Sequence, residues 1–209
     1  MLQRSLLSRE PVRAALAGAL AMALAMGLGR FFYTPVLPGM MAGLGLNAAD
    51  AGIIAAANFA GSLAGAVLAA YGWAAGHERR LALGALSATV LLLIAMGLLS
   101  GVVALSLVRF LAGLASAFAM IFTTGIVLAV GLVHEDPRVQ RVHFSGVGFG
   151  IALSAVLVYL LSLVEFQALA AWRIDWLAGA LLGVPGLAAV AILLPRPAGR
   201  ATATREPPV

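Results

Sequence analysis

The sequence contains no cysteine and no lysine, and only 10% of its 209 residues are charged. The absence of cysteine excludes disulfides, thiolate catalysis and cysteine-based metal sites. So few charges cannot cover a water-facing surface, because a soluble domain carries roughly 25% charged residues. Hydrophobic residues make up 63% of the chain, and its mean hydropathy is +1.06. These values exclude a soluble enzyme, a disordered chain and a nucleic-acid-binding module, and they predict an all-α membrane protein.

Six apolar segments are each long enough to cross a bilayer, whose core of about 30 Å takes about 20 helical residues. We expect them at residues 12–44, 48–71, 81–99, 103–132, 142–164 and 176–194. Each segment is hydrophobic all round, which is typical of helices surrounded by lipid or by other helices. The sequence therefore predicts a six-transmembrane-helix bundle over residues 12–194. Residues 1–11 would precede it, and a tail rich in Pro and Arg, 195–209, is expected to be disordered and cytoplasmic.

The placement of arginine predicts the orientation of this bundle. If six helices alternate in direction, ten of the thirteen arginines fall on one side, namely Arg4, Arg9, Arg13, Arg79, Arg80, Arg138, Arg141, Arg196, Arg200 and Arg205. The other side holds Arg173 alone, while Arg30 and Arg109 fall within spans. Because cytoplasmic loops carry the excess of positive residues, we expect both termini to be cytoplasmic.

Arg30 and Arg109 are the two arginines expected inside the membrane. An arginine at the centre of a span costs on the order of 2.5–3.5 kcal/mol, so it usually faces a cavity or a partner. Tyr33 and Thr34 follow Arg30 on one helix face, and Thr123 lies on the face of Arg109. Two guanidiniums at similar depth would attract a carboxylate or phosphate group. The alternatives are that Arg30 extends to the outer interface, and that each arginine hydrogen-bonds helix carbonyls at a packing contact.

Small residues recur every four positions in the second and fifth segments, as Ala57, Gly61 and Gly65 and as Gly146, Gly150 and Ser154. Such faces let helix backbones approach closely. They suit packing within one bundle, and they equally suit contact with a second bundle. Asn58, beside the first face, is the other polar residue expected at mid-membrane depth, where it favours an interhelical hydrogen bond.

Catalytic and metal-binding patterns do not stand out. No acidic residue is expected deep in a span, which argues against a proton relay through a buried carboxylate. None of the three histidines has a second ligand at metal spacing, and there is no G-x-S-x-G motif, no facing pair of carboxylates and no phosphate loop. We therefore predict a protein that is not an enzyme, with no catalytic site, no metal and no cofactor.

Five motifs occur in a characteristic order along the chain. They are GRFFYTPVLPGM at 29–40, AAANFAG at 55–61, RFLAG at 109–113, HFSGVGFG at 143–150 and WRIDW at 172–176. Together they resemble the YbfB/YjiJ-type transporters, a branch of the major facilitator superfamily (MFS). The resemblance covers the whole chain but only the N-terminal six of that family's twelve helices. Trp73 stands where the superfamily usually has an aspartate that helps to lock the cytoplasmic gate.

The resemblance implies an MFS-type N-terminal half in the bacterial inner membrane, as a multi-pass protein. In this superfamily the solute passes between two six-helix halves. The expected function is secondary active transport of a small anionic organic solute, with protons as a candidate coupling ion. The chain would act as a half-transporter, as a homodimer or with a separate C-terminal half. The residues expected to bind the solute are Arg30, Tyr33, Thr34, Asn58, Arg109 and Thr123. The alternative is a membrane bundle that does not transport, either a truncated remnant or a subunit that binds a partner protein.

Overall fold

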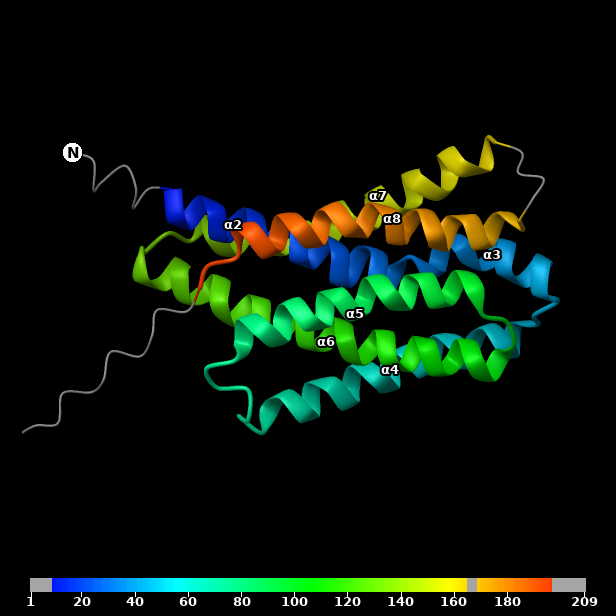
Figure 1. The fold of residues 1–209 in the computed structure, drawn as a ribbon, viewed down its shortest axis with the longest axis horizontal. Coiled ribbons are helices and arrows are strands. Elements are labelled where there is room, and N and C mark those ends of the chain that lie inside the picture. The colour runs from blue at the N-terminus through cyan, green and yellow to red at the C-terminus, as the bar shows by residue number, and fades with distance from the viewer. Residues whose placement is uncertain (1–8, 165–168, 197–209) are drawn as a thin grey trace, which may run out of the picture.

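The computed structural model describes residues 9–164 and 169–196, which form helices joined by short turns (Figure 1). The first expected span consists of three consecutive segments, α2 (Arg9–Met22), the π-helix η1 (Ala23–Phe31) and α3 (Tyr33–Leu44). The other helices are α4 (Ala48–Ala70), α5 (Glu78–Leu98), α6 (Val102–Val133), α7 (Arg138–Ser162) and α8 (Ala171–Leu193). With the first three segments taken as one, six helices are long and apolar enough to cross a membrane. The predicted all-helical bundle of six spans is confirmed.

The expected terminal segments fall largely outside the described residues. Of the segment 1–11, only residues 9–11 are described, and they already belong to α2. Of the tail expected to be disordered, only residues 195 and 196 are described.

The helices lie side by side and alternate in direction, so their turns gather at two ends of the bundle (Figure 1). We call one of them the termini end; it contains the start of α2, the turns at 71–77 and 134–137, and the end of α8. The opposite, far end contains the turns at 45–47 and 99–101, the end of α7 and the start of α8. The placement of arginine predicts that the termini end lies in the cytoplasm.

Glycines bring α4 and α6 into backbone contact. A Cβ added to Gly61 of α4 would overlap the carbonyl oxygen of Phe110 in α6, and a Cβ added to Gly113 of α6 would overlap that of Asn58 in α4. One turn beyond Gly61, a Cβ on Gly65 would press on the backbone of α6. Backbone atoms cannot move aside as the end of a side chain can. The close approach of α4 and α6 therefore requires glycine at these three positions.

Glycines also bring α7 into backbone contact with the first span. A Cβ on Gly146 would overlap the backbone of Ala19 in α2, and one on Gly150 would overlap that of Ala23 at the start of η1. Ser154 is buried on the same face and donates a hydrogen bond to the carbonyl of Ile151 on its own helix. Neighbouring helices of the bundle itself therefore occupy both small-residue faces.

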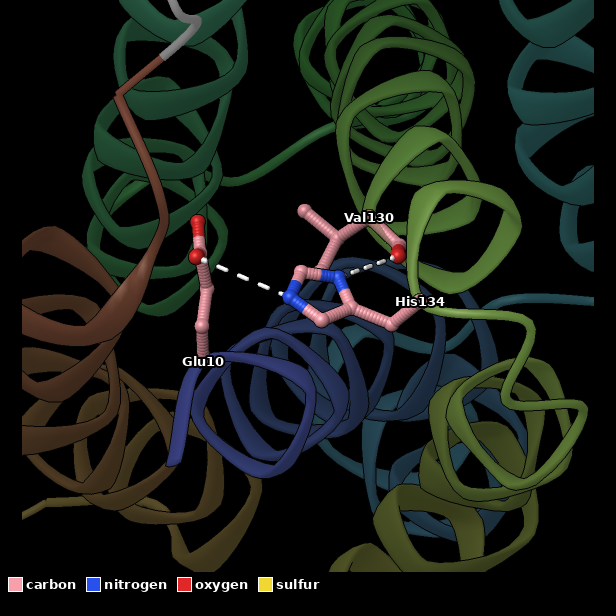
Figure 2. A network of polar contacts seen from close by, with 3 residues as sticks. All are labelled: Glu10, Val130 and His134. Carbon is pink, nitrogen blue, oxygen red and sulfur yellow. Dashed lines mark hydrogen bonds and ion pairs between the residues drawn. The ribbon is translucent and has the colours of Figure 1, made fainter. Parts of the chain in front are cut away.

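Polar side chains connect helix ends at the termini end. His134, just after α6, has its Nε2 3.9 Å from a carboxylate oxygen of Glu10 in α2, and its Nδ1 lies 3.0 Å from the carbonyl oxygen of Val130 (Figure 2). Arg79 of α5 donates to the carbonyl of Ala191 near the end of α8 at 2.6 Å. The bond from Arg79 satisfies a carbonyl that the last turn of α8 leaves without a backbone partner, and the contact of His134 with Glu10 connects the end of α6 to the start of α2.

Candidate functional site

The first membrane helix changes geometry next to its two prolines. In the π-helical segment a carbonyl bonds to the N–H five residues later. The carbonyl of Arg30 would therefore need the N–H of Pro35, which proline lacks. The chain passes through Phe32 into α3, where Pro38 removes a second donor. Carbonyl groups near Arg30 consequently need hydrogen-bond donors from another helix.

Arg109 of α6 supplies these donors. Its Nη1 donates to the carbonyl of Gly29 at 3.0 Å, and its Nη2 donates to the carbonyl of Arg30 at 2.8 Å. The guanidinium carbon lies 5.0 Å from the centre of the Tyr33 ring, and the residue is only 3% exposed. Its Nε has no hydrogen-bond partner among the described residues. Arg109 thus holds the break in the first helix through carbonyl bonds of the kind that the packing alternative expects.

Arg30 lies at the same level of the bundle, but its side chain has different surroundings. Its guanidinium carbon lies 5.1 Å from the centre of the Phe59 ring in α4 and 6.0 Å from that of Phe31. The side chain is partly exposed, and Phe59 is 60% exposed. The buried Nε of Arg30 has no hydrogen-bond partner among the described residues. The charge of Arg30 therefore lies at the surface of the bundle between η1 and α4, beside two aromatic rings.

The other residues expected to bind solute occupy three kinds of position. Asn58 and Tyr33 are buried and bond neighbouring helices: Asn58 Nδ2 donates to the carbonyl of Arg109 at 2.9 Å, and the Tyr33 hydroxyl donates to that of Ala51 at 3.1 Å. Thr34 is exposed on α3. Thr123 is fully buried, and its hydroxyl has no partner among the described residues. It lies fourteen residues beyond Arg109, or about 21 Å along α6, so the structure does not bring it to the arginines.

Two buried titratable residues are not among the site residues that the sequence predicts. His143 of α7 is fully buried, and its Nε2 lies 2.9 Å from the hydroxyl of Thr124 in α6. Asp175 is 7% exposed and lies inside α8, which begins at Ala171. Asp175 therefore lies inside a candidate span, close to its start and not deep within it. Hydropathy placed the start of the sixth span at Trp176, one residue beyond this carboxylate.

Trp73 holds the turn between α4 and α5 by aromatic packing. Its Nε1 donates to the carbonyl of Leu68 at 2.6 Å. Its ring meets those of Phe118 and Phe122 in α6 edge-on, with centroids 6.0 and 6.3 Å away. Trp73, packed against α6, thus fixes the turn at the position where the superfamily usually has an aspartate.

The charges and donors of this region favour binding of an anion over coordination of a metal. Among residues 9–164 and 169–196, no group of three or more His, Asp or Glu side chains lies together as a metal site requires. The guanidinium of Arg30, in contrast, offers several N–H donors in a plane, an arrangement that matches a carboxylate or phosphate.

Comparison with protein-family models identified a family for this chain. The profile of the family described as "Uncharacterised MFS-type transporter YbfB" matches residues 22–209, a range that begins at the end of α2 and takes in the rest of the bundle. A search of curated proteins found no match.

Proposed function

The chain belongs to the YbfB family of MFS-type transporters, and from this premise we propose that it carries a small anionic organic solute across the membrane by secondary active transport. Membership of this family and the six-span bundle make the chain a multi-pass membrane protein of the transporter class. The family resemblance favours the bacterial inner membrane as the location, and the arginine distribution favours a termini end in the cytoplasm.

The state of Arg30 is the observation that carries the proposal of an anionic solute. Its guanidinium is partly exposed, has no hydrogen-bond partner for Nε and stands beside Phe59 and Phe31. No carboxylate of the described residues pairs with it, since the ion pair found among them joins Glu10 to His134. A charge at this depth is costly without a partner. A carboxylate or phosphate group of a solute would supply that partner, in a field to which Arg109 adds a second positive charge.

The remaining proposed site residues would shape this region. Tyr33 and Asn58 fix the helices around the arginines through the hydrogen bonds described above. Thr34 offers an exposed hydroxyl one turn from Arg30. Thr123 would line the path nearer the termini end.

We infer that the translocation path needs a second set of six helices. In transporters built from two repeats, the solute passes between them. The guanidinium of Arg30 lies at the surface of this bundle, so further helices would have to cover it to enclose a solute. A further part of the same protein, a second copy of the chain or a separate C-terminal half could supply them, and the mass of the assembly in lipid nanodiscs distinguishes one copy from two.

Uptake into proteoliposomes tests the anion site. We expect uptake of at least one radiolabelled carboxylate among acetate, lactate, succinate and benzoate. We expect Arg30→Ala to reduce this uptake by about tenfold or more, since a hydrogen bond to a charged group contributes roughly 1.5–3 kcal/mol. Arg30→Lys should retain part of the activity, because it keeps the charge but not the planar donors.

Arg80→Ala is the matched control, because Arg80 is exposed at the termini end and outside the proposed site. Equal uptake by wild type and Arg30→Ala would refute the anion site. No uptake of any of the four carboxylates by the wild-type protein would favour the alternative, a membrane bundle that does not transport.

A further inference from the structure

Asp175 of α8 is a buried carboxylate that the proposed anion site does not use. It is 7% exposed, and no described residue donates a hydrogen bond to it. It is the fifth residue of α8, about 6 Å from the start of the helix at the far end. An aspartate that caps a helix lies at the N-cap or in the first turn. Asp175 lies beyond that turn, so helix capping does not account for it.

The carboxylate lines a cavity of about 180 Å³ between α3, α7 and α8. Pro35 and Gly39 of α3 form one wall, and Leu161 and Ser162 form another at the end of α7. The cavity has room for several water molecules at about 30 Å³ each. Its lining offers one carboxylate and the hydroxyl of Ser162 in otherwise apolar surroundings. Alkaline-earth cations take six or more oxygen ligands, so this lining suits a proton and not a metal ion.

Among the residues that the structure describes, no other charged group compensates the carboxylate. Arg173, on the same helix, donates to the carbonyls of Gly97 and Leu98 at 2.8 and 2.9 Å, so its guanidinium closes the end of α5. On the first span, Arg30 lies over the Phe59 ring of α4, and the hydroxyl of Tyr33 donates to the carbonyl of Ala51. The titratable residues of α5 are Glu78, Arg79 and Arg80, all at the termini end, and the described wall of α7 contributes no ionisable group.

We propose that Asp175 is a proton-binding site, which holds a proton while α3 packs against α8 and releases it when the cavity opens to water. A buried carboxylate without a donor is far costlier charged than neutral, whereas water stabilises the charged form. The exchange makes and breaks only O–H bonds: hydronium gives a proton to a carboxylate oxygen and becomes water, and on release a water molecule takes the proton and becomes hydronium.

The position of α3 connects this proton to the anion site. Pro35 and Gly39, which line the cavity, follow Arg30 within three turns of the same helical rod. Tyr33 and Thr34 of the proposed solute site belong to α3, so a change in the packing of α3 against α8 moves the cavity wall and these two residues together. If the proposed transport function holds, on which this step rests, the proton on Asp175 is the coupling ion of the solute bound at Arg30.

Infrared spectroscopy of the full chain in lipid nanodiscs tests the proton site without a solute. At neutral pH we expect the carbonyl-stretching band of a neutral carboxyl group, which disappears as the pH is raised and shifts in heavy water. Asp175→Asn should remove this band completely. Glu135→Gln, which alters an exposed carboxylate after α6, should leave it unchanged. Absence of the band from the wild-type protein at neutral pH, or its persistence in Asp175→Asn, would overturn the proposal.

Two further measurements separate this inference from the proposed function. Should Asp175→Asn fail to fold, as judged by circular dichroism, Asp175→Glu keeps the acid and is expected to shift the frequency of the band; an unshifted band would overturn the proposal. In proteoliposomes, Asp175→Asn should keep solute exchange but lose the acceleration of uptake by an inward proton gradient. A retained acceleration refutes the coupling role. A wild-type band without any uptake leaves the proton site intact and counts against transport.

Discussion

Replacing Arg109 with alanine is expected to destabilise the bundle by about 2–6 kcal/mol. The substitution removes the side-chain donors of the carbonyls of Gly29 and Arg30, and a group left unsatisfied costs about 1–3 kcal/mol. It also removes the guanidinium from the Tyr33 ring. Unfolding of the detergent-solubilised protein, followed by circular dichroism against temperature or denaturing detergent, measures the loss.

Two variants identify the cause of this loss. Arg109→Lys keeps the charge but has no planar pair of donors for two carbonyls, so an intermediate stability is expected. Arg30→Ala is the matched control, because it removes an arginine at the same level whose contacts are aromatic and largely superficial. If Arg109→Ala unfolds at the wild-type temperature, the two carbonyls have another donor, and the role assigned to Arg109 is wrong.

Replacing Gly113 with alanine is expected to destabilise the protein by about 3 kcal/mol or more. The added methyl group would overlap the carbonyl of Asn58, a backbone atom that moves only if the whole of α4 moves. Overpacking of a core usually costs about 1–3 kcal/mol, and here no side chain can rearrange to relieve it. Separation of α4 from α6 would also break the hydrogen bond from Asn58 to the carbonyl of Arg109.

Gly52→Ala is the control for this prediction. Gly52 lies in α4, and no atom lies within 4 Å of an added Cβ. Because alanine favours a helix over glycine by about 1 kcal/mol, this variant should unfold at an equal or a higher temperature. Similar unfolding temperatures for Gly113→Ala and Gly52→Ala would show that the close approach of α4 and α6 is not required for stability.

The fold was predictable because the sequence repeats one pattern, a long apolar run, six times. Six apolar runs, each of a length that a bilayer demands, leave no alternative to a helical bundle. The rise of an α-helix per residue also placed Arg30 and Arg109 at similar depth, and the hydrogen bond from Arg109 to the carbonyl of Arg30 agrees with this placement.

The use of each polar side chain was harder to predict, because it depends on geometry that hydropathy does not describe. The carbonyls that bind Arg109 need a donor because of the π-helix, and a π-helical stretch has no simple sequence signature. Thr123 shares a helix face with Arg109, but the rise of the helix over fourteen residues already implies a separation of about 21 Å along the axis, so the sequence itself argued against a common site. Asp175 was missed because the start of a span was set by hydropathy, whereas α8 begins at Ala171, before the apolar run.

The junction at Phe32 has a mechanical consequence for the first span. Where an ordinary helix bends, its backbone bonds break, and within a membrane no water is at hand to replace them. At this junction the side chain of Arg109 in α6 already donates hydrogen bonds to the carbonyls of Gly29 and Arg30. The helix α3, which follows Phe32, can therefore change its tilt while Arg109 stays bonded to the carbonyls of Gly29 and Arg30. Such a tilt displaces Gly39 more than Pro35, because Gly39 lies farther from the junction.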